Sequence, residues 1–191
     1  ERQYDIVIYG ASGFTGRLVA QYMAAHDGLG SRWAIAGRSL AKLEAVRDDI
    51  GAPSVPLLQA DAEDPASLRA MVAQTRCVCS VVGPYQLYGS GLVAACADLG
   101  TAYVDLTGEP LWMHEMIAAH GGRAAETGAR IVHSCGFDSV PFDLGVLHLQ
   151  TAARRQFGQP CQRVHARVRS MKGAFSGGTA ASLNATEDRV A

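Results

Sequence analysis

Charge is scarce in this sequence of 191 residues, of which only 18% are Asp, Glu, Lys or Arg. Soluble domains usually carry about 25% charged residues. Because 48% of the chain is hydrophobic, it has enough apolar side chains for a large core, and we do not expect it to be disordered. The formal net charge is −1, so the chain lacks the basic excess with which dedicated nucleic-acid binders neutralise phosphates. We therefore expect no nucleic-acid partner.

The sequence also lacks an uninterrupted hydrophobic run. Residues 77–97 carry no charge, and about 20 such residues would span a bilayer. Glycines and Pro84 interrupt them, which indicates a strand, a turn and a helix rather than a membrane span. The five cysteines are odd in number and include no Cys-x-x-Cys pair, and residues 1–5 do not resemble a signal peptide. We expect a reduced, cytoplasmic setting, with which association at a membrane surface is compatible.

Several catalytic patterns are absent as well. Lysine occurs only at positions 42 and 172, and neither stands four residues after a tyrosine, which excludes the Tyr/Lys pair of short-chain dehydrogenases. No lysine follows the glycines that begin at Gly10, so a Walker loop is excluded too. His114 and His120 are too far apart to share one helical face as metal ligands. We expect no metal site, and we expect a bound cofactor to supply the chemistry.

Short apolar segments alternate with amphipathic stretches along most of the chain. Because the apolar segments are nearly continuous rather than alternating with polar residues, they are typical of strands buried on both faces. Strand and helix in alternation predict an α/β fold, with a Rossmann-type doubly wound parallel sheet, over residues 1–140. The predicted strands are 5–9, 33–36, 55–58, 77–82, 103–106 and 130–133.

The sequence changes character near residue 141. Residues 1–143 hold 10 basic and 16 acidic residues, whereas residues 144–191 hold seven basic and two acidic ones. Residues 163–169 alternate Arg or His with Val or Ala, which predicts a strand with one solvated face. We therefore expect residues 141–191 to begin a second, α+β domain for substrate binding or dimerisation, which so short a segment would leave incomplete.

A glycine-rich loop directly follows the first predicted strand and precedes a helix. In this context one glycine permits the turn, one lets the backbone approach a pyrophosphate, and one lets helix and strand pack closely. A glycine turn without a ligand is the competing interpretation. The predicted cofactor-binding residues of this loop are Gly10, Ala11, Ser12, Gly13, Phe14, Thr15 and Gly16.

The end of the second predicted strand indicates which dinucleotide is bound. NAD binders place a carboxylate there for the ribose 2′-hydroxyl, whereas NADP binders place an arginine for the 2′-phosphate. This chain has Arg38 and Ser39 and no carboxylate, so we expect NADP(H) rather than NAD(H). A solvated surface charge at Arg38 is the alternative.

Further cofactor contacts are expected after the third and fourth strands. Asp61 stands where such folds contact the adenine, although it could instead initiate the next helix. Val82, Gly83, Pro84 and Tyr85 follow the fourth strand and should border the middle of the cofactor or its nicotinamide. Tyr85 could equally be a half-buried loop aromatic.

The candidates for a catalytic side chain are Asp138 and Tyr85. Asp138 lies just past the sixth predicted strand and could orient a substrate or donate a proton. Its alternative role is to cap the helix that follows Pro141. His133, within an apolar segment, is expected to be a satisfied core residue.

Five stretches together resemble the saccharopine dehydrogenase-like oxidoreductases. The likeness covers almost all of residues 4–183, including 176–179, and is greatest to the actinobacterial trans-acting enoyl reductases of polyketide-derived lipid and glycolipid synthesis. The resemblance implies hydride transfer from NADPH to the β-carbon of an acyl double bond, in proteins considerably longer than this chain. The stretches are 4–16, 36–38, 82–85 with Tyr88-Gly89, 103–109 and 134–141.

The resemblance also implies a small-molecule or carrier-bound acyl substrate. Six basic residues and no acid lie between Asp143 and Glu187, a surface that could receive an acidic acyl carrier protein. A solvated surface, or one covered by another part of the protein, is the alternative. A homodimer is compatible with the second domain. Two other functions stay open: a saccharopine-type dehydrogenase acting on an amino-acid-derived imine, and a non-catalytic NADP(H)-sensing module.

Overall fold

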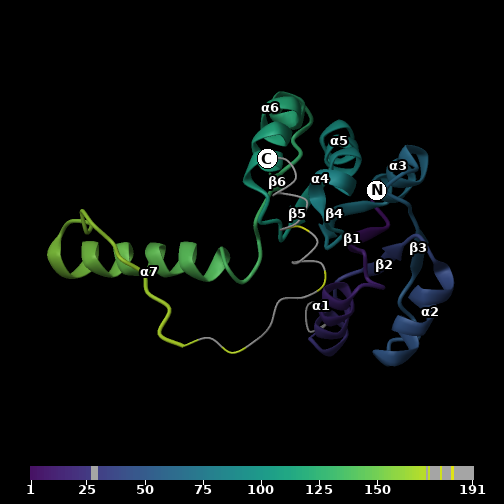
Figure 1. Cartoon of the computed structure of the whole chain (residues 1–191), viewed down its shortest axis with the longest axis horizontal. Coiled ribbons are helices and arrows are strands. Elements are labelled where there is room, and N and C mark those ends of the chain that lie inside the picture. The colour runs from purple at the N-terminus through teal and green to yellow at the C-terminus, as the bar shows by residue number, and fades with distance from the viewer. Residues whose placement is uncertain (27–29, 171, 173–176, 178–181, 183–191) are drawn as a thin grey trace.

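The computed structural model describes residues 1–26, 30–170, 172, 177 and 182. Strands and helices alternate along the chain as far as residue 157 (Figure 1). They are β1 (Tyr4–Tyr9), α1 (Phe14–Ala25), β2 (Trp33–Gly37), α2 (Leu40–Asp49), β3 (Leu57–Gln59), α3 (Pro65–Ala73), β4 (Thr75–Ser80), α4 (Tyr85–Tyr88), α5 (Ser90–Leu99), β5 (Ala102–Asp105), α6 (Pro110–Thr127), β6 (Ile131–Val132) and α7 (Val140–Phe157).

The six strands form one parallel sheet in the order β3-β2-β1-β4-β5-β6. The chain winds outward from β1 in one direction to β3 and then returns to β4 on the other side of β1. This order confirms the predicted doubly wound Rossmann-type fold, and it places the topological switch point between β1 and β4. In such sheets a ligand binds outside the carboxyl ends of the strands at the switch point.

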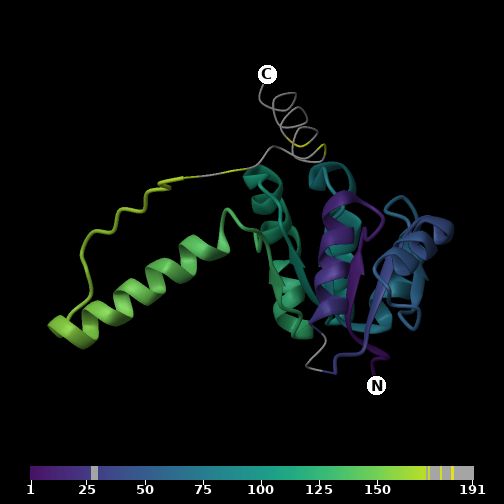
Figure 2. The ribbon, with the colours of Figure 1, turned by 90° about the horizontal axis from the view of Figure 1, so that it is seen from below.

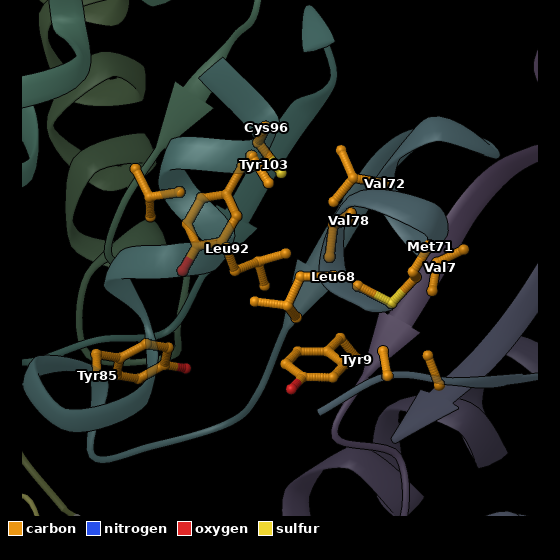
Figure 3. Packing of buried hydrophobic residues seen from close by; sticks show 14 of the residues in the cluster. Val7, Tyr9, Leu68, Met71, Val72, Val78, Tyr85, Leu92, Cys96 and Tyr103 are labelled. Carbon is orange, nitrogen blue, oxygen red and sulfur yellow. The ribbon is translucent and has the colours of Figure 1, made fainter. Parts of the chain in front are cut away.

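Helices cover both faces of the sheet, which explains why the strands lack polar alternation. On one face, Val7 and Val78 pack with α3, α5 and α6 through residues such as Leu68 and Leu92 (Figure 3). On the other face, Ile8 and Ile35 pack against α1 and α2. Because successive residues of a strand point to opposite faces, Val7 and Ile8 are both fully buried although they are adjacent.

The strand boundaries differ by a few residues from those that the sequence predicts. Strand β3 begins at Leu57, after Pro56, which has no N–H to donate to a neighbouring strand. Strand β4 begins at Thr75 and ends at Ser80 rather than at residue 82. Val81 still donates its N–H to Tyr9 O at 2.9 Å, and Val82 then leaves the sheet at its carboxyl edge.

The segment after β6 departs from the sheet. Helix α7 extends away from the sheet in both views (Figures 1 and 2), and only Ala153 among its residues is buried. The strand predicted over residues 163–169 is wrong, because these residues are irregular and pair with none of the six strands. A strand needs a hydrogen-bonded neighbour, which an alternating pattern alone does not supply. The predicted domain boundary at residue 140 stays a prediction, and the 176–179 motif lies outside the described residues except for Gly177.

In the described part of the chain, no helix combines the length and the apolar character that are needed to cross a membrane.

Candidate functional site

A cleft of about 400 Å³ lies at the carboxyl ends of β1, β2, β3 and β4. It therefore occupies the switch point at which doubly wound sheets bind their ligands. Polar and apolar groups from four different strand ends meet there. Nine of the predicted binding residues line it: Gly10, Ser12, Gly13, Phe14, Thr15, Arg38, Asp61, Val82 and Gly83.

The three loop glycines have different surroundings. Gly10 has a φ of +93°, and a Cβ there would lie 2.6 Å from Val82 Cγ2, so only glycine fits. A Cβ on Gly16 would collide with the carbonyl oxygen of Gly10 and lie 2.7 Å from Ala11 Cα, so this glycine lets α1 pack against the loop. A Cβ on Gly13 would meet only Gly10 O, at 3.4 Å, and Gly13 itself lines the cleft. Gly13 therefore leaves room for a ligand rather than for protein atoms.

Helix α1 begins at this loop without a side-chain cap. Its N-cap residue is Gly13, which has no side chain to accept from the first amides. Phe14 and Thr15, the first two residues of the helix, both line the cleft. The first-turn amides of a helix have no partner within the helix and carry the positive end of its dipole. This end of the cleft therefore suits a pyrophosphate.

Arg38 and Asp61 line the opposite side of the cleft, after β2 and β3. Arg38 forms no ion pair with any described residue, which leaves its guanidinium available to a phosphate. Asp61 Oδ1 accepts from the amide of Glu63 at 3.1 Å, so it shapes the turn after β3 as well as lining the cleft. Helix α3 is instead capped by Asp64, whose Oδ1 accepts from Ala66 N at 3.0 Å. Ser39 caps α2, accepting from Lys42 N at 3.4 Å, and does not line the cleft.

Tyr9 is a cleft residue that sequence reasoning missed. It is the last residue of β1, it is only 3% exposed, and it lines the cleft beside Gly10. Burial raises the pKa of its hydroxyl to about 12; the charge of Asp61 adds to the shift, and that of Arg38 opposes it. Its position directly before Gly10, the first glycine of the loop, could have indicated that Tyr9 lies at the cleft. Gly37, Ala62, Glu63, Val81 and Tyr88 also line the cleft.

The structure does not bring Tyr85 into the cleft. Its side chain is buried, and its hydroxyl donates to the carbonyl oxygen of Ser80 at 3.1 Å. Tyr88, three residues further on, is 39% exposed and lines the cleft instead. Pro84 precedes α4 and does not line the cleft, and Ala11 is buried beneath the glycine loop. This placement favours a positioning role for Tyr85 over a catalytic one.

Asp138 lies in the turn that precedes α7. Its side chain is exposed and is not among the groups that line the cleft. Ser139 occupies the N-cap position of α7, and no side-chain hydrogen bond caps that helix. Asp138 therefore shows neither the predicted cap nor a contact with the cleft, and its catalytic role stays a prediction.

His133 and Cys79 do not line the cleft. His133 follows β6 with its side chain 4% exposed, as expected for a core histidine, and its Nδ1 lies 2.6 Å from Asp105 Oδ2. It is not fully satisfied, because its buried Nε2 has no hydrogen-bond partner among the described residues. Burial raises the pKa of the Cys79 thiol to about 11, so it is a poor nucleophile at neutral pH. Across the described residues, no group of three or more His, Cys, Asp or Glu is placed to hold a metal ion.

Fold and site together define a class of protein. A doubly wound parallel sheet, an uncapped helix N-terminus behind a glycine loop, and an arginine after β2 are the parts of a dinucleotide-binding domain. The space left by Gly13, and Arg38, which forms no ion pair within the described part of the chain, fit a pyrophosphate and a 2′-phosphate. Residues 6–132 match the family model described as the saccharopine dehydrogenase NADP binding domain. The chain belongs to this family, which confirms both the predicted resemblance and the predicted cofactor, NADP(H).

Curated relatives include proteins from mycobacteria. A protein of Mycobacterium tuberculosis named as a trans-acting enoyl reductase is 52% identical over 184 residues, which are 95% of this chain and 44% of the relative. A trans-acting enoyl reductase of Mycobacterium ulcerans is 49% identical over 155 residues, which are 80% of this chain and 37% of the relative. The chain thus spans less than half the length of these relatives.

Solved structures share the fold at low sequence identity. Saccharopine dehydrogenase (L-Glu forming) from Saccharomyces cerevisiae superposes with a TM-score of 0.63 at 19% identity, over 79% of this chain and 32% of that chain. Triphenylmethane reductase from Citrobacter sp., solved with NADP(H), gives a TM-score of 0.50 at 20% identity, over 78% and 55% of the two chains. Both support the Rossmann-like architecture.

Proposed function

We propose that this chain is the NADP(H)-binding part of an enoyl reductase that reduces the double bond of an acyl intermediate in lipid synthesis. The observation that carries the proposal is the 52% identity, over 95% of the chain, to a relative named as a trans-acting enoyl reductase. The cleft supports it, because its residues suit a dinucleotide with a 2′-phosphate.

Each side of the cleft has a distinct task in this proposal. Arg38 binds the 2′-phosphate with its planar, bidentate guanidinium, and the amides of Phe14 and Thr15 bind the pyrophosphate. Val82, Gly83 and Tyr88 then form the wall along the nicotinamide half, at the end of β4. When bound, NADPH supplies the hydride for the β-carbon of the enoyl group. Asp138 stays our candidate for the group that delivers the proton to the α-carbon.

A carrier-bound acyl substrate and an acidic carrier protein are the partners that we propose. Arg163, Arg167 and Arg169 are exposed and offer positive charge to such a carrier. Reversing the charge of Arg167 and Arg169 should raise the KM for a carrier-bound enoyl substrate and leave that for a short enoyl thioester unchanged. Equal KM values for the variant and the parent with the carrier-bound substrate would contradict the docking role.

We also propose a cytoplasmic homodimer. Its five cysteines are free thiols, as expected in a reducing compartment. Helix α7 exposes apolar side chains, including Leu144 and Leu147, which a second copy would cover. Light scattering on the eluted chain should give twice the monomer mass, and a Leu144→Glu, Leu147→Glu variant should elute as a monomer. A monomeric parent chain would contradict the dimer.

The reaction is tested with an enoyl thioester and NADPH labelled with deuterium at C4. The chain and the M. tuberculosis relative are assayed side by side, because the relative is more than twice as long. The proposal predicts loss of NADPH absorbance and a saturated product with deuterium at the β-carbon. A relative that binds NADPH but reduces no enoyl thioester would contradict it. Reduction of an amino-acid-derived imine alone would favour the saccharopine-type reaction.

A further inference from the structure

The two helices that begin at the edge of the cleft differ at their N-termini. The N-terminus of α1 is open, whereas a buried carboxylate occupies that of α4. Glu109 is 3% exposed; its Oε1 accepts from the amide of Tyr85 at 3.0 Å and its Oε2 from the amide of Gln86 at 2.7 Å. Both oxygens therefore accept from the backbone of α4, although Glu109 lies 23 residues beyond Gln86 in the sequence.

Glu109 is itself held in place by buried groups. Its amide donates to Thr107 Oγ1 at 3.1 Å, and the amide of Thr107 donates to Asp105 Oδ1 at 3.1 Å. Asp105 is the last residue of β5, and it also bonds His133 beyond β6. The carboxylate of Glu109 is thus fixed relative to the sheet and not merely to the loop that carries it.

A second connection joins the same two segments. The hydroxyl of Tyr85 donates to Ser80 O and accepts from the amide of Leu106 at 3.4 Å, so it joins the end of β4 to the loop after β5. The Trp112 ring lies 5.5 Å from that of Tyr85, measured between centroids. A Cβ on Gly89 would approach Trp112 Cζ2 to 2.6 Å, so the junction between α4 and α5 lies close to α6.

The hydrogen bonds from the amides of Tyr85 and Gln86 stabilise the charged form of Glu109. An isolated buried carboxylate is costly, and Glu109 forms no ion pair with a cation among the described residues. A glutamine would keep one acceptor oxygen but turn an NH2 group toward an amide that also donates. The backbone of α4 would then lose one of its two fixed points.

We infer that Glu109 is the positioning residue for the nicotinamide side of the cleft, acting through the amides of Tyr85 and Gln86. Val82, Gly83 and Tyr88, which line that side, directly flank the peptide segment that Glu109 holds. Arg38 is at the other side, after β2, where the 2′-phosphate binds. Glu109 therefore controls the binding of one half of the ligand and not of the other. This inference rests on the binding of NADP(H) in the cleft.

The test compares the affinity for NADPH with the affinity for a ligand that represents only its adenosine half. Calorimetric titrations of the 191-residue chain use NADPH and adenosine 2′,5′-bisphosphate, which reaches only the Arg38 side. Glu109→Gln should weaken NADPH binding by about tenfold, as expected for the loss of one charge-assisted hydrogen bond, and change the affinity for the bisphosphate by less than about twofold. A generally less stable protein would lose affinity for both ligands.

Two further variants keep the result decisive. Thr107→Val removes the acceptor for the Glu109 amide while leaving the carboxylate in the chain, and should show the same selective loss to a smaller extent. Glu126→Gln, the same exchange at an exposed carboxylate of α6 that does not line the cleft, should change neither affinity. If Glu109→Gln and Thr107→Val bind NADPH as tightly as the parent, or weaken both ligands equally, the inference is overturned. A parent chain that fails to bind NADPH would instead contradict the proposed function.

Discussion

Gly13 and Gly16 stand three residues apart in one loop, yet substitution of each should have a different effect. Gly13 has a φ of −81°, which alanine adopts freely, and it lines the cleft, where a methyl group would take space from a ligand. Gly13→Ala should therefore lower NADPH affinity at least about tenfold while lowering the free energy of unfolding by only about 1 kcal/mol or less. Gly16→Ala should lower that free energy by more than about 2 kcal/mol, because its Cβ collides with backbone atoms.

Urea unfolding and NADPH titration of both glycine variants measure these effects. Equal NADPH affinity for Gly13→Ala and the parent chain would show that the loop does not approach a ligand at this position.

The ionisation of Tyr9 should make the free energy of unfolding depend on pH. Because burial raises its pKa to about 12 in the folded chain, against about 10 in the unfolded chain, the unfolded state loses the proton first as pH rises. The stabilisation is fully present below pH 10 and is lost between about pH 10 and 12, by on the order of 2 to 3 kcal/mol. Burial likewise raises the pKa of Tyr85 and of Tyr103.

Urea unfolding from pH 8 to pH 12 should show this fall, and Tyr9→Phe should remove part of it because phenylalanine has no proton to lose. Superimposable pH profiles for the variant and the parent would contradict the assigned environment of Tyr9.

Individual side-chain roles were the least predictable feature. Tyr85 and Tyr88 lie in the same short segment. The sequence around them does not indicate that Tyr85 is buried and that Tyr88 lines the cleft. Glu109 likewise reads as an ordinary acid before the Pro110 that begins α6. Its contacts with α4 depend on the pairing of β4 with β5, which brings distant segments together.

At the scale of elements, the side chain of Arg2 caps the carboxyl ends of two helices, α3 and α5. The guanidinium of Arg2 donates to Val72 O at 3.0 Å and to Ala73 O at 2.5 Å, at the end of α3, and to Leu99 O at 2.6 Å, at the end of α5. A cation there also opposes the negative ends of both helix dipoles. Arg2→Ala should lower the free energy of unfolding by about 1 to 3 kcal/mol, measured in urea.

A conservative exchange serves as the control at this position. Arg2→Lys keeps the charge but lacks the fork of donors, so its stability should lie between the alanine variant and the parent. An alanine variant as stable as the parent would show that solvent satisfies these carbonyl groups equally well.

The sequence predicted the strands well where burial on both faces of the sheet gives a continuous run of apolar residues. Strands such as β1 and β2 carry continuous apolar residues because helices cover both sides, and the glycine loop fixes where α1 begins. The strand expected over residues 163–169 failed because alternation describes a solvated face but not a pairing partner. Local pattern therefore predicts the sheet and its switch point, whereas contacts between distant segments decide which side chains reach the cleft.

The whole molecule is organised around the carboxyl edge of one sheet. Strand order brings the ends of β1, β2, β3 and β4 to a single cleft, which contains an open helix N-terminus and an arginine. The family match, over residues 6–132, covers the segment that forms this cleft. The central claim is therefore that the cleft holds NADP(H) and that Arg38 selects the 2′-phosphate.

Parallel calorimetric titrations of NADPH and NADH into the parent chain and into Arg38→Gln test that claim most directly. The parent should bind NADPH about ten to one hundred times more tightly than NADH, because a charge-assisted, bidentate contact to the phosphate is lost with NADH. Arg38→Gln should bind the two with nearly equal affinity, while its affinity for NADH stays close to that of the parent. Equal affinities of the parent chain for NADPH and NADH would contradict the claim.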